Sequence, residues 1–283
     1  MARLTAPRVH HLLGIACVTL LAAACNRDPA PATPAKAPSP SSPSASTALA
    51  DIAETTPGYV IGITFPPMAN RHPGLAADLK AYADAARGEL VQAARQREKV
   101  PGAMPYELSL SFTEVLDSPQ LVAVAADGTS YTGGAHGAPL LARFVWLPRE
   151  DQRLTAARLV PSAEGWEAIA MVVREQLHTA LSQRIDADEL PAGERAALVE
   201  SVGRMIDEGT APQVSNFEQF EPVVDATGKV TALRFVFAPY QVGPYSDGAQ
   251  TVEVPASVLL PHVAPAYRGL FAGAAPAPAS PTG

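Results

Sequence analysis

Cysteine is nearly absent from this sequence of 283 residues, and it is missing altogether from the part with globular composition. The 2 cysteines, Cys17 and Cys25, both lie in the N-terminal segment. The rest of the chain therefore has no means of forming a disulfide, a thiolate metal site or a cysteine nucleophile.

Several catalytic and ligand-binding signatures are missing as well. The sequence has no His-Glu-x-x-His helix, no Gly-x-Ser-x-Gly nucleophile elbow and no glycine-rich loop with a phosphate-binding lysine. The histidines beyond the N-terminal segment are far apart, so no spacing supports a zinc site, although distant ligands can converge in space: His72, His136, His178 and His262. We therefore expect no catalytic constellation, no cofactor and no metal ion.

Basic residues are outnumbered by acidic ones, 21 to 28, which gives a formal net charge of -7 at pH 7. The first 24 residues carry Arg3 and Arg8 and no acidic residue, so their removal lowers the net charge by two, to -9. An acidic body argues against nucleic acid as a partner and against docking on anionic lipid. It permits a cationic protein partner, and solubility alone explains it equally well.

The sequence also lacks an apolar run long enough to cross a bilayer. Leu12–Ala24 is apolar over about 13 residues, whereas a membrane-spanning helix needs about 20. With two arginines before it, the run is typical of a signal peptide over residues 1–24. The run ends in Leu-Ala-Ala-Ala-Cys25, which resembles a bacterial lipobox with Ala22 in the usual place of leucine. This predicts a lipid on Cys25, and ordinary cleavage after small residues is the alternative.

Composition then divides the rest of the chain into three parts. Residues 25–51 begin with Cys25 and continue as a Pro/Ala/Ser tether that we expect to be disordered, because it has too few apolar residues to fold. Residues 52–271 have the composition of one globular domain. Residues 272–283 form an Ala/Pro-rich tail, which we also expect to be disordered.

Periodicity within the domain predicts both strands and helices. Apolar and polar residues alternate over 106–113, which is typical of a half-buried strand in a sheet with one wet face. The expected strands are 59–65, 106–113, 121–125, 140–147, 233–237 and 251–255, and the expected helices are 75–97, 162–184, 193–206 and 257–260. Asp127-Gly128 is a tight-turn signal after the third of these strands. The pattern favours an α+β fold with a largely antiparallel sheet and packed helices.

The stretch Tyr131-Thr-Gly-Gly-Ala-His136-Gly137 combines the most backbone freedom in the chain with an ionisable side chain. Glycine is used where the chain needs φ > 0 or close approach, so the stretch is a demanding turn or a site. His136 has the chemistry of a general base, a ligand contact or a metal ligand, and it also suits simple bonding to neighbouring backbone. Tyr240 and Tyr245, which flank Pro244, suit either a sugar-stacking or protein-contact platform or the packing of a loop.

Two motifs in order carry a family resemblance: Tyr131-Thr-Gly-Gly-Ala-His136 and Phe237-Ala-Pro-Tyr240-Gln-Val-Gly-Pro-Tyr245-Ser-Asp247-Gly248. They resemble the RsiV-like family, a bacterial extracytoplasmic domain. It is shared by the lysozyme-sensing anti-sigma factor RsiV and the non-catalytic N-terminal part of the peptidoglycan deacetylase PdaC. The resemblance spans most of residues 55–265, and the sequence departs from it at Gly243, where the family usually has alanine.

The resemblance implies a single α+β domain that faces the cell envelope and binds rather than catalyses. It marks as binding or family-motif residues Tyr131, Gly133, Gly134, His136, Tyr240, Tyr245 and Asp247. The expected function is an envelope-anchored lipoprotein that binds peptidoglycan or a lysozyme-like wall hydrolase, without catalysis. An envelope hydrolase using His136 and a purely structural envelope lipoprotein are the alternatives.

The same reasoning gives a location in the periplasm. Asn26, rather than aspartate, follows Cys25, which resembles the sorting rule for lipoproteins of the outer membrane. Contact with the membrane is then through the lipid anchor only.

Labelled fatty acid tests the lipid anchor. In a bacterial host that processes lipoproteins, the full-length chain is expected in the membrane fraction with label on Cys25, because small-residue cleavage exposes that cysteine. Cys25→Ser removes the acceptor and should remove the label. Recovery of the unsubstituted chain as a soluble, unlabelled mature protein would contradict the lipobox interpretation.

Overall fold

The computed structural model describes residues 48–97, 104–187 and 190–274, which belong to one compact unit. The signal peptide, Cys25, most of the expected tether and the last residues of the expected tail lie outside the described residues. The domain's contacts begin slightly before residue 52. The backbone N–H of Leu49 donates to Asn70, and Asp51 accepts from the N–H of Phe65.

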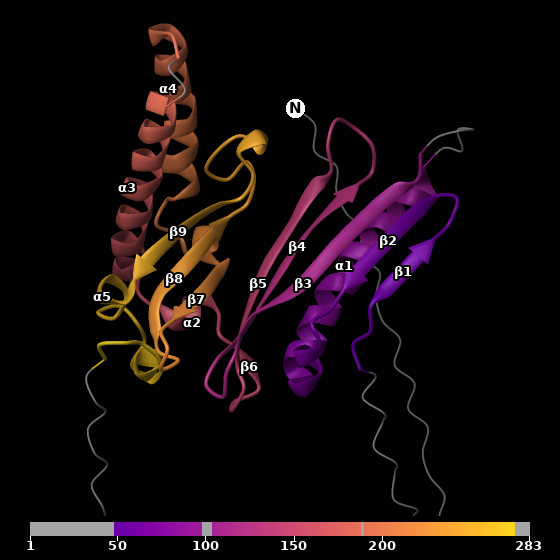
Figure 1. The fold of residues 1–283 in the computed structure, drawn as a ribbon, viewed down its shortest axis with the longest axis horizontal. Helices are drawn as coiled ribbons and strands as arrows, with labels where there is room; N and C mark the ends of the chain where they lie inside the picture. Colours follow the sequence, from indigo (N-terminus) through magenta and orange to yellow (C-terminus); the bar gives the residue numbers. More distant parts are fainter. Residues whose placement is uncertain (1–47, 98–103, 188–189, 275–283) are drawn as a thin grey trace, which may run out of the picture. The chain divides into compact units, whose positions relative to one another are not determined.

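The N-terminal half forms a six-stranded sheet in which the strands are neighbours in sequence order (Figure 1). The strands are β1 (Ile52–Thr55), β2 (Tyr59–Thr64), β3 (Tyr106–Asp117), β4 (Val122–Tyr131), β5 (Ala138–Leu147) and β6 (Gln152–Arg153). β2 and β3 are parallel and all other neighbours are antiparallel. A parallel pair needs a long crossover, which here includes α1 (Pro73–Gln96), and this helix packs on the sheet.

The C-terminal half forms a second, three-stranded antiparallel sheet and most of the remaining helices. Its strands are β7 (Phe220–Val224), β8 (Val230–Phe237) and β9 (Gln250–Pro255). The α-helices are α2 (Ala156–Leu159), α3 (Ala163–Ala187), α4 (Ala192–Gly209) and α5 (Ala256–Leu259). Short 3₁₀ helices are η1 (Pro67–Arg71), η2 (Val214–Phe217), η3 (Tyr245–Asp247) and η4 (Pro265–Leu270). The long helices α3 and α4 pack against each other.

Strands β4 and β5 are buried on both faces over residues 122–126 and 142–147, which joins the two halves. Successive side chains of a strand point to opposite faces. The cross-strand pair Val124 and Phe144 packs in the core beneath α1. The neighbouring pair Ala123 and Val145 packs instead in the core formed with α3, α4 and the second sheet. Apolar residues at successive positions of these strands therefore reflect two cores, one on each side.

Arg143 of β5 is the main polar link between the two sheets. Its side chain is only 8% exposed, and its Nε lies 2.6 Å from Oε1 of Glu221 in β7. This contact is an ion pair, not a well-aligned hydrogen bond. The Arg143 backbone N–H donates to Gln219 Oε1 at 2.7 Å, and its carbonyl accepts from Arg153 at 2.8 Å. Side chains thus satisfy the backbone of β5 where β6 does not reach it.

The expected α+β class is confirmed, with two sheets in place of one. The half-buried alternation expected over 106–113 appears in β3, and Ser162 caps α3 by accepting from the N–H of Gly165 at 3.2 Å. Sequence periodicity did not reveal the short strands β1, β6 and β7. β1 and β6 have four and two residues, and so short a run contains little periodicity.

The expected tight turn at Asp127-Gly128 is wrong. β4 continues through both residues to Tyr131, and Gly128 lies opposite Leu110 of β3. A Cβ at residue 128 would come within 2.1 Å of the Ser109 carbonyl oxygen. The glycine permits close approach of two strands, which is the other common use of glycine inside a strand.

Replacement of Gly128 tests this explanation. Gly128→Ala should lower the free energy of unfolding by about 2 kcal/mol or more, because the clash is with backbone atoms of β3. Gly62→Ala in β2 is the matched control, since no atom lies within 4 Å of its added Cβ. Chemical denaturation should show a change of no more than about 0.5 kcal/mol for the control. Equal effects of the two substitutions would contradict the close-approach explanation.

Candidate binding site

The glycine-rich stretch forms the hairpin loop between β4 and β5, as its composition predicts. Gly133 and Gly134 have φ of 100° and 99°, a region that other residues rarely adopt. The Tyr131 hydroxyl donates to the Gly134 carbonyl at 3.1 Å and holds the loop from within. The loop exposes His136 to solvent.

The second motif forms the loop between β8 and β9. Tyr240 adopts φ of 73°, and its N–H donates to the Gly243 carbonyl at 3.0 Å. The Gln241 side chain donates to the carbonyls of Gly209 and Asn216, which anchors the loop to the end of α4. At Gly209 the backbones lie so close that an added Cβ would approach the Gln241 carbonyl oxygen to 2.0 Å.

The structure brings the two motifs together although their residues are 104 or more positions apart in the sequence. The His136 and Tyr245 rings are stacked, with centroids 4.0 Å apart and planes at 14°. The Tyr240 hydroxyl lies 3.1 Å from His136 Nε2, and the Tyr245 hydroxyl donates to the Gly137 carbonyl at 3.2 Å. We call His136, Tyr240 and Tyr245 the aromatic platform.

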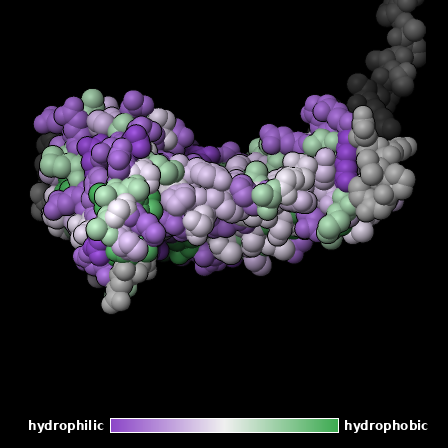
Figure 2. Space-filling view, turned by 90° about the horizontal axis from the view of Figure 1, so that it is seen from above, coloured by the Kyte–Doolittle hydropathy of each residue, from purple (hydrophilic) through white to green (hydrophobic). Residues whose placement is uncertain are grey.

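The platform lies at the end of the sheets where both loops project (Figure 1). Tyr240 is 55% exposed, His136 is exposed, and Tyr245 is half-buried beneath the histidine. Seen from above, the visible surface is mainly hydrophilic or of intermediate hydropathy, with small scattered hydrophobic areas (Figure 2). Such a surface suits a polar ligand that makes aromatic contacts, because tyrosine combines an apolar ring with a hydrogen-bonding tip.

The hydrogen bonds of His136 define its chemistry. A carbonyl only accepts, so the 3.3 Å contact of Nδ1 with the Gly137 carbonyl places a proton on Nδ1. In the neutral ring, Nε2 then accepts from the Tyr240 hydroxyl. A histidine that acts as a general base is usually oriented by a third group, often a carboxylate. No carboxylate of the described residues forms an ion pair with His136, so none of them orients the ring in this way.

Asp247 belongs to a different group of contacts. Its carboxylate accepts from Arg184 of α3 at 2.5 Å, and the two side chains line a small cavity of about 200 Å³ beside α3 and α4. Glycine at position 243 leaves room for this carboxylate. A Cβ there would lie 3.3 Å from Asp247 Oδ2, which is a tight contact. The carboxylate therefore fixes the second loop to α3, a role that the sequence did not reveal for Arg184.

Two further features of the described residues are relevant to function. Within these ranges no cluster of three or more histidine, cysteine, aspartate or glutamate side chains is arranged to hold a metal ion. Nor does any helix in the same ranges have the length and apolarity needed to cross a membrane.

The comparisons with known proteins find a match to a family model over part of the chain and a similar fold over most of it. Residues 167–257 match a family model described as "Protein of unknown function (DUF3298)". This segment runs from α3 to α5 and includes Tyr240 and Tyr245, whereas His136 lies outside it. No curated protein matches the sequence.

Two solved structures are similar to this chain. A DUF3298 family protein from Pseudomonas aeruginosa PAO1 has 18% identity and a TM-score of 0.52, over 79% of this chain and 96% of that one. A member of the DUF3298 family from Bacteroides fragilis NCTC 9343 has 15% identity and a TM-score of 0.48, over 76% and 92%. The likeness to the Pseudomonas protein shows a shared α+β fold, and residues 167–257 carry the sequence match to the DUF3298 family.

Proposed function

We propose that this chain is an envelope-anchored bacterial lipoprotein whose RsiV-like domain is a non-catalytic module that binds peptidoglycan. The observation that carries the proposal is the aromatic platform, in which two distant motifs place His136, Tyr240 and Tyr245 on one exposed surface. The glycan strands of peptidoglycan offer both ring faces for stacking and hydroxyl groups for hydrogen bonds.

The backbone of Tyr240 supports a binding role. A bulky residue with φ of 73° costs about 1–3 kcal/mol, and such strain is found most often at binding and active sites. The strain positions a ring that is 55% exposed, beside the stacked His136 and Tyr245. A side chain fixed before binding loses less entropy when the ligand arrives, so it binds more tightly.

A lysozyme-like wall hydrolase is the second candidate ligand, and the charge of the chain favours it. The net charge of -9 that remains after removal of residues 1–24 attracts a cationic enzyme, and complementary charge speeds association at low salt. If the ligand is such an enzyme, the tyrosines of the platform contact its surface. Tyrosine suits this role, because it is enriched among the residues that dominate binding energy at interfaces. The membrane enters through the lipid anchor only.

Two alternatives make different demands on the same residues. An envelope hydrolase would use His136 as a base together with a nearby acid. The lack of a carboxylate partner for His136 among the described residues gives this alternative little support. A purely structural lipoprotein would need neither an exposed Tyr240 nor strain at that residue.

Co-sedimentation of the full-length chain with purified peptidoglycan sacculi tests the proposal. Tyr240→Ala should weaken retention about tenfold, because it removes the most exposed ring of the platform. Met171→Ala on α3 is the control, since this side chain is 65% exposed and lies outside the platform. A parallel assay on immobilised lysozyme, repeated at higher salt, separates the second candidate, whose binding should weaken with salt.

Three results would decide against this function. Absence of retention on both sacculi and lysozyme at low salt would contradict the proposed binding function. Equal retention of Tyr240→Ala and Met171→Ala would show that the aromatic platform is not the binding surface. Turnover of a glycan or ester substrate that is lost in folded His136→Ala would favour the hydrolase instead.

A further inference from the structure

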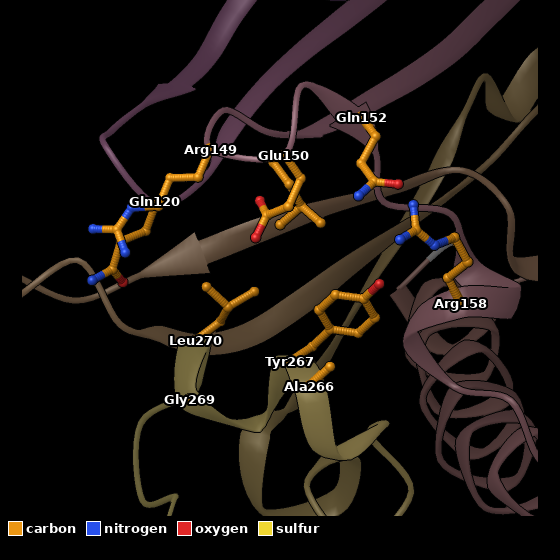
Figure 3. Close-up of a pocket in the computed structure, with 10 residues that line it drawn as sticks. Gln120, Arg149, Glu150, Gln152, Arg158, Ala266, Tyr267, Gly269 and Leu270 are labelled. Atoms are coloured by element: carbon orange, nitrogen blue, oxygen red, sulfur yellow. The ribbon is translucent and has the colours of Figure 1, made fainter. Parts of the chain in front are cut away.

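A second cleft, of about 400 Å³, lies away from the aromatic platform. It is lined by the turn between β5 and β6, by α2 and by η4, as Figure 3 shows. β5 has ten residues, or about 30 Å at about 3.3 Å per residue, and the platform loop precedes it while the cleft follows it. The two surfaces are therefore at opposite ends of this strand.

One wall of the cleft is a rigidly held turn that carries Arg149 and Glu150. The next residue, Asp151, has φ of 46°, and its carboxylate accepts from the Trp146 indole at 3.0 Å and from the Gly74 N–H at 3.3 Å. A non-glycine residue at positive φ persists only where its surroundings enforce it. The turn is thus fixed between β5 and the start of α1, and it presents Arg149 and Glu150 outward.

The opposite wall is η4, which carries Tyr267 and Leu270. Contacts at Gly269 and just beyond the cleft residues anchor the segment. Lys229 donates to the Gly269 carbonyl, and Phe271 is only 3% exposed. Beyond it, the Ala272 N–H donates to the Val230 carbonyl at 2.9 Å. The Tyr267 ring is therefore held in place as the apolar surface of the cleft.

The third wall contributes Arg158 of α2 in a prepared position. One guanidinium nitrogen donates to the Arg153 carbonyl at 2.8 Å, and Cζ lies 5.8 Å from the centre of the Tyr267 ring. A guanidinium has five N–H donors in a fixed plane, so donors remain for a ligand. In Figure 3, the guanidinium of Arg149 lies beside Gln120 at one end of the cleft and that of Arg158 lies at the other end, with Glu150 and Tyr267 between them.

The charged side chains of the cleft have no ion-pair partners in the described part of the chain. Many other arginines there form ion pairs with carboxylates: Arg87, Arg143, Arg184, Arg195 and Arg234. Arg149, Glu150 and Arg158 form no such pair among the described residues, although all three line one cleft. Convergent polar groups around an apolar surface are what a small-ligand site requires.

We propose that this cleft binds a short acidic peptide with free amino groups. Carboxylates at the two ends of the ligand pair with Arg149 and Arg158, and an ammonium group between them pairs with Glu150. The stem of the peptide packs on Tyr267 and Leu270, and the amides of Gln120 and Gln152 bond its backbone. Guanidinium groups match carboxylates in shape as well as charge, which favours this ligand over a neutral sugar.

This site does not depend on the aromatic platform. The stem peptides of the bacterial cell wall have the required chemistry, so a wall-binding lipoprotein would meet such a ligand. If the platform binds no glycan, the cleft can still bind peptide. An undiminished retention of Tyr240→Ala on sacculi would count against the platform only. An absence of peptide binding in the assay below would count against the cleft only.

Isothermal titration of the full-length chain with γ-D-glutamyl-diaminopimelic acid tests the cleft. This probe has carboxylates near both ends and free amino groups, and its N-acetylated form is the second probe. Arg149→Gln and Arg158→Gln should each weaken binding of the free-amine probe about tenfold, because each removes a charged hydrogen-bond donor. The control is Arg95→Gln in the exposed last turn of α1, which should leave the affinity unchanged.

Glu150→Gln gives the sharpest result. The unsubstituted chain should prefer the free-amine probe over its acetylated form about tenfold, and the variant should lose most of that preference. Thermal unfolding checks that each variant is folded. No heat of binding with the free-amine probe at millimolar concentration would overturn the proposal. Binding that both arginine variants retain, or a preference that Glu150→Gln keeps, would equally overturn it.

Discussion

The buried ion pair between Arg143 and Glu221 is the interaction on which the arrangement of the two sheets depends. Both side chains are largely inaccessible, with 8% and 10% exposure. Arg143 also bonds the carbonyls of Ala126 and Ala142 and the carboxylate of Asp127. Removing one partner of a buried pair leaves the other charge without compensation, which typically costs 3–5 kcal/mol, roughly. The pair therefore specifies how β5 meets β7.

The charge network continues into the second sheet. Glu221 lies 3.5 Å from Arg234 of β8, which in turn lies 2.6 Å from Glu253 of β9. The hydrogen bond to Glu253 raises the pKa of Arg234, so the guanidinium stays protonated. With the sheets joined in this way, the β4–β5 loop and the β8–β9 loop meet, and the ring of Tyr245 reaches that of His136.

Local pattern in the sequence predicted most of the elements but not their connections. The alternation in β3 and the apolar stripes of α1 and α3 depend on neighbours one to four residues away, so they can be read from the chain. Gly128 was mistaken for a turn because its use depends on Ser109 of another strand. Likewise Arg143, Arg184 and Gln241 act on residues distant in sequence, and their own surroundings in the chain give no sign of this.

For the candidate site, too, the sequence predicted the local features but not the contacts between distant residues. Its residue types were evident from the two motifs, including the glycines that the hairpin loop needs at positive φ. The stacking of His136 on Tyr245 joins positions from different sheets, which no periodicity encodes. The motifs also grouped Asp247 with the platform, but that carboxylate is paired with Arg184. The charged cleft at the far end of β5 had no motif, because its residues come from four segments that are separate in the sequence.

The most direct measurement of this account is the nuclear Overhauser effect between the ring protons of His136 and Tyr245 in solution. With centroids 4.0 Å apart, the rings should give clear cross-peaks in the unsubstituted chain. The cross-peaks should weaken or disappear in folded Arg143→Gln, where the sheets lose their buried ion pair. Absence of the cross-peaks from the unsubstituted chain, or undiminished cross-peaks in the variant, would contradict a platform held together by Arg143.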